Sequence, residues 1–204
     1  MDTPVLSSAG FDPHGLRSRL RALQPCPIDE RFAGFTPAAV LVPVVIGGAE
    51  PTLLLTRRSA HLYDHPGQIA FPGGRVDPGD VSPEATALRE AQEEIGLAAG
   101  QVELIGRLPD YFITASGFRV TPVVGLLHAP LALQLDPFEV AEAFETPLSF
   151  LIDPSNRTRG RIEHEGVMRE YWAMPWQGYD IWGATAGMIV SFAEHLLAEP
   201  PSRR

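Results

Sequence analysis

Cysteine is nearly absent from this chain of 204 residues, whose only thiol is that of Cys26. A single cysteine excludes an internal disulfide and a zinc site built from several thiolates. We expect Cys26 to pack as a small apolar side chain, which fits a reducing, cytoplasmic setting. The first residues also lack the basic region and continuous apolar run of a secretory signal, so export is not expected.

Positive charge and long apolar runs are scarce as well. The chain carries 16 Lys and Arg residues against 25 Asp and Glu residues, for a formal charge of −9. Proteins that hold nucleic acid by its phosphates need clustered positive charge, so a nucleic-acid partner is disfavoured, although a local basic pocket for a small phosphate ligand is not. No segment reaches the roughly 20 apolar residues that span a bilayer, so we expect no membrane partner. The sequence does not indicate an oligomeric state.

The chain does have enough apolar residues for one sizeable core. Its hydrophobic fraction of 45% is typical of a globular protein, and its length suggests one domain. Leu16, Leu20 and Leu23 recur at helical spacing after a small, polar, proline-containing start. We therefore expect residues 1–34 to form an arm and a short helix that packs on a domain of residues 35–204.

Apolar and alternating runs predict a sheet with helices on both faces. Strands are expected at 38–46, 53–57, 69–71, 102–108, 111–114, 120–127 and 179–182, with a further hairpin across 161–172 at the edge of the sheet. Helices are expected at 83–95, at 136–146 and from about residue 183 onward, the second opening with the capping-box spacing of Asp136 and Glu139. These elements predict the α/β class, as an α/β/α sandwich around a mixed β-sheet.

Residues 73–97, which read GGRVDPGDVSPEATALREAQEEIGL, are the most informative stretch. Ser82 is a good N-cap, Pro83 suits the first helical position, and Gly96 suits the left-handed residue that ends a helix. The sequence therefore predicts a glycine-rich loop followed by a helix. A helical projection predicts an apolar side of Ala85, Leu88, Gln92 and Ile95 and an acidic side of Glu90, Glu93 and Glu94.

The acidic side of this helix needs a counter-charge. Glu90 and Glu94 are one turn apart, where like charges repel by roughly 0.2–0.5 kcal/mol. Arg89 can pair with Glu93, which leaves Glu90 and Glu94 facing each other. A divalent cation such as Mg²⁺ binds through one or two carboxylates plus substrate phosphates and fits that remainder. A solvated acidic face is the alternative interpretation of the same spacing.

The loop before the helix favours the metal interpretation. Glycines at 73 and 74 allow a main-chain carbonyl to approach a metal ion closely. The run resembles the signature of the Nudix hydrolases, a glycine-rich loop followed by a helix with Arg-Glu-x-x-Glu-Glu-x-Gly. The matching residues are Gly74, Arg89, Glu90, Ala91, Glu93, Glu94, Gly96 and Leu97. Where that family has a glutamate five residues after the glycine, this chain has Asp80, in a loop that is one residue longer.

The resemblance implies a Nudix-type fold and a pyrophosphatase that uses Mg²⁺ or Mn²⁺. It assigns the metal ligands to Glu90, Glu94, Glu93 and the carbonyl of Gly74. The general base stays open between Glu93 and Glu139, because a carboxylate from outside the motif often completes the metal shell or acts as the base in this family. Glu139 also has a structural interpretation, as the residue that closes a capping box.

A second informative stretch runs from Leu54 to Gly74. Arg57 and Arg58 leave an expected strand together, and a guanidinium can fork onto phosphate oxygens, although strand alternation lets only one of them face a site. The stretch is similar to the Nudix branch that cleaves coenzyme A, with Leu-Leu-Thr-x-Arg-Ser followed by His-x-Gly-Gln-x-Ala-Phe-Pro-Gly-Gly. The matching residues are Leu54, Leu55, Thr56, Arg58, Ser59, Leu62, His65, Gly67, Gln68, Ala70, Phe71, Pro72, Gly73 and Gly74. Substrate contacts are therefore expected from Arg57, Arg58, His65 and Gln68.

Coenzyme A, or its oxidised or acylated forms, is the substrate that this resemblance implies, with 3′,5′-ADP and 4′-phosphopantetheine as products. Two alternatives stay open. One is a pyrophosphatase for another nucleoside diphosphate derivative, such as NADH or ADP-ribose. The other is a Nudix-like module that binds a ligand without hydrolysing it, against which the intact Glu90, Glu93 and Glu94 argue.

Overall fold

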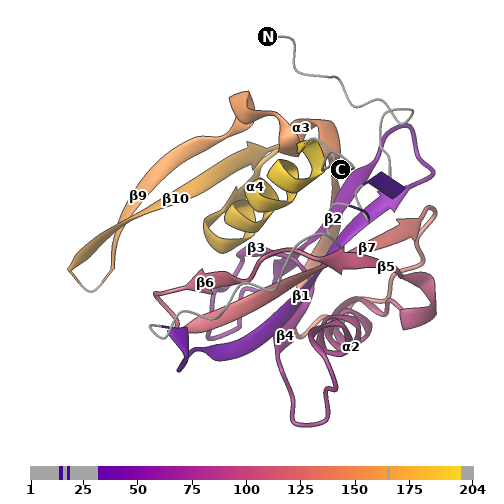
Figure 1. Ribbon diagram of the computed structural model, residues 1–204, viewed down its shortest axis with the longest axis horizontal. Helices are drawn as coiled ribbons and strands as arrows, with labels where there is room; N and C mark the ends of the chain where they lie inside the picture. The colour runs from indigo at the N-terminus through magenta and orange to yellow at the C-terminus, as the bar shows by residue number, and fades with distance from the viewer. Residues whose placement is uncertain (1–13, 16–17, 19–31, 165, 199–204) are drawn as a thin grey trace, which may run out of the picture.

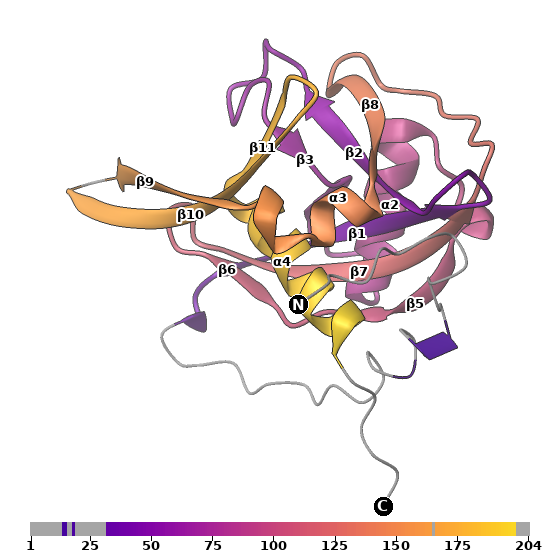
Figure 2. The same ribbon diagram turned by 90° about the horizontal axis from the view of Figure 1, so that it is seen from above.

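The computed structural model describes residues 14–15, 18, 32–164 and 166–198. The short helix expected around Leu16, Leu20 and Leu23 lies outside these residues. Figures 1 and 2 show a large twisted sheet with helices on opposite faces and a long hairpin that extends away from the body.

Within the described residues the large sheet is mixed and has eight strands. At its centre β1 (Thr36–Ile46) runs parallel to β7 (Phe118–His128), and β2 (Thr52–Arg58) lies antiparallel to β1 on the other side. The remaining strands are β3 (Ile69–Ala70), β4 (Gly73–Arg75), β5 (Glu103–Arg107), β6 (Tyr111–Ile113) and β8 (Val140–Pro147). The main path runs β3-β2-β1-β7-β5, while β4 pairs with β1, β6 with β7 and β8 with β2.

Apolar residues line both faces of the central strands. Leu41 and Val42 are neighbours on β1 and point to opposite faces, yet neither side chain is exposed. Helix α2 (Pro83–Ile95) covers one face, and α4 (Gly183–Leu197) with α3 (Leu148–Ile152) covers the other (Figures 1 and 2). The expected α/β/α sandwich around a mixed sheet is therefore confirmed. Within the part of the chain described, no helix is long and apolar enough to cross a membrane.

The hairpin expected at the edge of the main sheet belongs instead to a second sheet. It consists of β9 (Thr158–His164) and β10 (Val167–Trp176), and β11 (Tyr179–Trp182) completes a three-stranded sheet of order β11-β10-β9. Because β10 pairs with β9 on one edge and with β11 on the other, it has no edge left for the main sheet. The far end of the β9–β10 hairpin stands clear of the body in Figure 2.

The helix predicted at 136–146 is wrong, because most of that segment forms strand β8. Asp136 does accept a hydrogen bond from the Phe138 N–H, at 2.9 Å, but this bond closes a turn before the strand. From Val140 onward the chain pairs along β2, with Val140 opposite Arg58 and Pro147 opposite Thr52. The capping-box spacing of Asp136 and Glu139 occurs in turns as well as at helix starts. Here pairing with the free edge of β2 decides the outcome in favour of a strand.

Candidate active site

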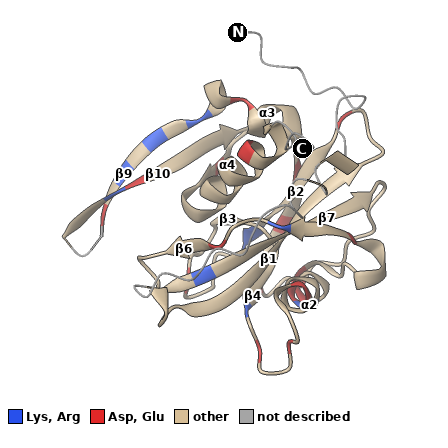
Figure 3. Cartoon of the chain, viewed as in Figure 1, with Lys and Arg blue, Asp and Glu red and all other residues tan. Residues whose placement is uncertain are grey.

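Helix α2 begins and ends where the sequence predicts. The Ala85 N–H donates to the Ser82 hydroxyl, Pro83 occupies the first turn, and Gly96 ends the helix in the left-handed region with φ of 69°. Figure 3 shows acidic residues on this helix and on the loop before it. The helix and that loop therefore present several carboxylates near the end of β4.

The face that α2 buries differs from the predicted one. The buried residues are Thr86, Ala87, Ala91, Glu94 and Ile95. Of the expected apolar side, only Ile95 is buried, and Gln92 is exposed. The small side chains of Ala87 and Ala91 let the helix approach the sheet closely. The helix is therefore rotated about its axis relative to the predicted orientation, and Glu94 faces inward. The acidic residues thus lie at three depths, with Glu94 buried, Glu90 half-buried and Glu93 exposed.

Glu90 and Glu94 both lie against the glycine strand β4. The Gly73 N–H donates to Glu94 Oε2 at 3.3 Å, and a Cβ at Gly74 would fall 2.5 Å from Glu90 Oε1. Gly73 is also fixed as glycine, because its φ is +157° and a Cβ there would lie 2.4 Å from the Ala39 carbonyl oxygen. The absence of a side chain at Gly74 therefore leaves space for the Glu90 carboxylate, whereas at Gly73 it lets β4 approach β1 closely.

Burial destabilises the charged form of both carboxylates, and Glu90 further destabilises that of Glu94. Burial raises the pKa of Glu94 to about 8, and the charge of Glu90 adds to this rise, while the Gly73 N–H and the Arg58 charge oppose it. Burial likewise raises the pKa of Glu90. A cation between the two groups would relieve both effects.

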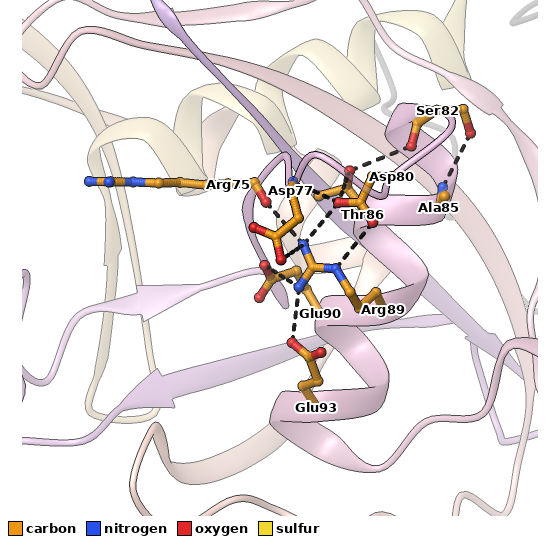
Figure 4. Close-up of polar contacts among 9 residues, drawn as sticks. All are labelled: Arg75, Asp77, Asp80, Ser82, Ala85, Thr86, Arg89, Glu90 and Glu93. Carbon is orange, nitrogen blue, oxygen red and sulfur yellow. Dashed lines mark hydrogen bonds and ion pairs between the residues drawn. The ribbon is translucent and has the colours of Figure 1, made fainter.

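Arg89 holds one edge of this acidic group together (Figure 4). It pairs with Glu93 as predicted, at 2.9 Å, but the same Nη1 also reaches Glu90 at 2.9 Å, so Glu90 is not left to face Glu94 alone. Asp80 accepts from Arg89 Nε at 3.2 Å and from Nη2 at 3.0 Å, and it accepts a further bond from the Thr86 hydroxyl. The Arg89 guanidinium, the Asp77 N–H and this hydroxyl hold the pKa of Asp80 below its ordinary value. The longer loop thus still brings a carboxylate to Arg89.

The two adjacent arginines of β2 point to opposite faces, as alternation requires. Arg57 faces the α4 side, where it pairs with Glu142 at 2.8 Å and lies over the Tyr179 ring at 5.0 Å. Arg58 lies on the α2 side, and its charge lowers the pKa of Glu94. Of the two predicted phosphate contacts, only Arg58 is close to the acidic group.

The loop between β2 and β3 carries the other two predicted contacts. His65 is exposed, with a positive φ of 55°, and its carbonyl accepts the Gln68 N–H in a turn. Gln68 is half-buried, and its carbonyl accepts the Arg58 N–H. These contacts join both residues to the end of β2 through the main chain.

Glu139 lies in the turn before β8 and not in a helix, within electrostatic range of the acidic pair. Its charge raises the pKa of both Glu90 and Glu94, which places its carboxylate within electrostatic range of both. The main chain around it is held by Ser59, whose N–H donates to the Glu139 carbonyl at 2.9 Å and whose hydroxyl donates to the Pro137 carbonyl at 3.0 Å. Sequence reasoning gave Ser59 no role, because a bond that spans about eighty residues leaves no local pattern.

The oxygen ligands of this site fit a small, hard cation whose coordination shell is completed by substrate phosphates. Throughout the described residues, no group of three or more His, Cys, Asp or Glu side chains is arranged to hold a metal ion. Two carboxylates and the neighbouring Gly74 carbonyl are nevertheless what Mg²⁺ commonly takes from a protein when substrate phosphates supply further ligands. The raised pKa of the buried Glu94 supports this reading, because that carboxylate has little other positive charge beside it.

Comparisons with known proteins agree with this geometry. Residues 35–170 match the NUDIX domain family. A protein of Enterobacter sp. (strain 638), described as an uncharacterized Nudix hydrolase NudL, is 44% identical over 163 residues, which are 80% of this chain and 84% of that protein. A protein of Citrobacter koseri with the same description is 45% identical with the same coverage. The solved NUDIX domain of Shewanella oneidensis NrtR, complexed with ADP ribose, has a TM-score of 0.51 at 18% identity over 84% of this chain and 95% of that one, which supports the fold alone.

Proposed function

This chain belongs to the Nudix hydrolase family, and from that premise we propose that it hydrolyses the pyrophosphate bond of coenzyme A. The products would be 3′,5′-ADP and 4′-phosphopantetheine, with oxidised or acylated coenzyme A as further candidate substrates. We assign this activity to residues 35–204, with Mg²⁺ or Mn²⁺ as the metal and the cytoplasm as its setting.

One structural relationship supports the substrate most directly. The stretch that is similar to the coenzyme A branch, Leu54–Gly74, forms β2, β3 and the start of β4, and these elements border the acidic pair. Its last glycines contact Glu90 and Glu94, and its Arg58 lies within electrostatic range of Glu94. The segment that carries the resemblance is therefore next to the proposed reaction centre, where it can contact the groups that flank the diphosphate.

The chemistry follows from the charge of a diphosphate. Glu90, Glu94 and the Gly74 carbonyl, with Glu93 as a further candidate ligand, would hold Mg²⁺ or Mn²⁺, which would supply positive charge to the phosphate oxygens and acidify a bound water. Arg58 adds positive charge on the same side of the sheet and offers a fork of donors to a phosphate oxygen. Attack of water on phosphorus breaks the bridging P–O bond and gives two monophosphates.

Proton transfer from the attacking water needs a base near the acidic pair. Glu139 is our first candidate, because its charge acts on both Glu90 and Glu94 while its own main chain is fixed by Ser59. Glu93 is the second candidate, although it is exposed and bound to Arg89. Arg89 therefore acts as a positioning residue that orients Glu90 and Glu93 and is itself held by Asp80.

A substrate panel tests the proposal. Purified protein is incubated with coenzyme A, acetyl-coenzyme A, NADH and ADP-ribose in Mg²⁺ or Mn²⁺, and the monophosphate products are separated and identified. We expect the highest kcat/KM for coenzyme A or its derivatives, and no turnover for any substrate by the Glu90→Gln, Glu94→Gln double variant. Higher kcat/KM for NADH or ADP-ribose would overturn the coenzyme A assignment, and binding without product from any substrate would overturn hydrolysis.

A further inference from the structure

An exposed aromatic pair lies beside the acidic group and has no part in the chemistry above. Phe138 is 64% exposed, an unusual state for a phenylalanine in a folded protein. Its ring lies 4.8 Å from that of His61, at an interplanar angle of 57°. His61 comes from the loop after β2 and Phe138 from the turn before β8, so two separate segments form the pair.

The turn that carries Phe138 is firmly held. The Phe138 N–H donates to Asp136 Oδ1 at 2.9 Å, and the Asp136 N–H donates to the main-chain carbonyl of Glu94 at 2.9 Å. Ser59, two residues before His61, bonds to the carbonyls on both sides of Phe138, those of Pro137 and Glu139. The main chain that carries the ring is therefore held in place, which lowers the entropic cost of binding against it.

The pair is also close to the proposed reaction centre. Phe138 lies two residues after Asp136, whose N–H donates to the main-chain carbonyl of Glu94, and consecutive Cα atoms are about 3.8 Å apart. Arg58, on the same side of the sheet, lies three residues before His61. An aromatic ring, the Arg58 guanidinium and the acidic pair proposed to hold the metal are therefore close neighbours on one side of the sheet.

We propose that Phe138, supported by His61, is a stacking platform for the nucleobase of the substrate's nucleotide half. A nucleobase is a planar ring joined through ribose to a phosphate, so its phosphate can lie at the acidic pair while its base lies on the phenyl ring. Base–aromatic stacking also favours an exposed ring, because it needs one open face and no surrounding cavity. The flexible pantetheine arm, rich in amides, gains less from a lone ring that offers it no hydrogen bonds.

The platform rests on one part of the proposed function, that the substrate is a nucleoside diphosphate derivative. It does not require that this substrate be coenzyme A. Adenine is common to coenzyme A, NADH and ADP-ribose, so AMP serves as the probe for the nucleotide half, and 4′-phosphopantetheine serves for the other half. Inhibition constants for both are measured on full-length protein with the best substrate of the panel, for wild type, Phe138→Ala, Phe138→Leu and Phe138→Trp. Met168→Ala is the matched control, since Met168 is 60% exposed on the distant β10.

Stacking predicts a selective pattern. Phe138→Ala and Phe138→Leu raise the inhibition constant of AMP about tenfold, within the range that removal of one base-stacking side chain produces, and leave that of 4′-phosphopantetheine within twofold. Phe138→Trp retains or tightens AMP binding, and AMP quenches its added fluorescence relative to wild type. Met168→Ala changes neither constant.

The outcomes that overturn the platform are distinct from those that overturn coenzyme A as the substrate. A wild-type AMP constant in Phe138→Leu would mean that the ring contributes only apolar contact, and an equal rise for both inhibitors would mean that the turn itself was damaged; either result removes the platform. So does a rise for 4′-phosphopantetheine alone. If coenzyme A is not hydrolysed but AMP still quenches Phe138→Trp, the platform stands and the substrate assignment fails.

Discussion

Gly74 and Glu90 are in such close contact that the glycine has no room for a side chain. A Cβ at Gly74 would lie 2.5 Å from Glu90 Oε1 and 2.6 Å from its Cδ. The glycine thus fixes where the carboxylate sits relative to the β4 main chain.

Gly74→Ala should therefore displace the Glu90 carboxylate and reduce activity. We expect kcat/KM to fall about 100-fold, as small misplacements of catalytic groups commonly do, together with weaker Mg²⁺ binding by calorimetry. Gly79→Ala is the control, because a Cβ at Gly79 meets nothing within 4 Å. Equal activity in both variants would show that the contact does not matter.

Glu94→Gln should separate stability from activity. Glu94 is buried and its pKa is raised to about 8, so at pH 7 the metal-free protein must protonate this carboxylate on folding, which costs stability above the unfolded pKa; a neutral amide of the same shape avoids that cost and should raise Tm in EDTA by about 3 °C. Turnover should fall by orders of magnitude. Differential scanning fluorimetry and product assays measure the two effects, with the exposed Glu163→Gln on β9 as the control. A Tm several degrees below wild type would contradict the argument.

Glu139 and Glu93 can be ranked as general bases by their kinetics. Glu139→Gln should lower kcat by about 10²- to 10⁴-fold with a small change in KM, since loss of a base affects proton transfer rather than binding. Glu93→Gln should lower kcat less, because Glu93 is exposed and bound to Arg89. Steady-state kcat and KM, measured side by side for wild type and both variants, give the ranking. The reverse ranking would assign the base to Glu93.

Arg58 and Arg57 form a natural matched pair. Arg58→Ala should raise KM about 10- to 100-fold, the range for a lost charge-assisted hydrogen bond to phosphate. Arg57→Ala removes a half-exposed pair with Glu142 and should change KM less than threefold and stability by less than about 1 kcal/mol. Similar KM increases in both variants would mean that the substrate extends to both faces of the sheet.

The Asp80–Arg89 contact should give a stability that depends on pH. The pKa of Asp80 is lower in the folded protein than in the unfolded chain, mainly because of its hydrogen bonds from Arg89. The stabilisation is therefore complete above the unfolded pKa of about 3.9 and is lost as the pH falls toward the folded value. Asp80→Asn should lower Tm by about 5 °C at pH 7, and the difference from wild type should narrow below about pH 4.

Asp77→Asn is the control for that measurement. Asp77 lies on the same loop and 3.9 Å from the same guanidinium, but its side chain is 64% exposed, so its removal should hardly change Tm at either pH. A difference between wild type and Asp80→Asn that stays constant down to pH 3 would show that the carboxylate charge contributes nothing.

The parts of the site that could be predicted from the sequence are those fixed by local chemistry. Ser82, Pro83 and Gly96 delimit α2 because capping depends on residues within one turn, and the pairing of Arg89 with Glu93 depends only on helical spacing. The apolar runs also predicted the strands that precede and follow α2 along the chain. The Nudix resemblance then supplied the fold, which the family match confirms.

The remainder depended on contacts between distant segments. Glu94 is buried because the helix packs on the sheet through Ala87 and Ala91. The distribution of apolar residues along the helix does not predict which face packs in this way. Strand β8 was assigned to a helix because Asp136 caps a turn as readily as a helix, and the edge of β2 that decides between them lies about ninety residues earlier. Ser59 was part of the matched stretch, but its bond to the turn before β8 could not be predicted, because it joins segments about eighty residues apart.

The parallel pairing of β1 with β7 has a consequence for how the protein is made. Thr36 pairs with Phe118 and Ile46 with His128, so β2, β3, β4 and α2 all lie in the crossover between the two strands. Such pairing gives a high contact order, and folding of this kind is slow because a long loop must close first. During synthesis the complete acidic motif leaves the ribosome before β7 does. A nascent chain at that stage carries every residue of the signature without the sheet that buries Glu94, so we expect it to bind divalent ions only after β7 has docked.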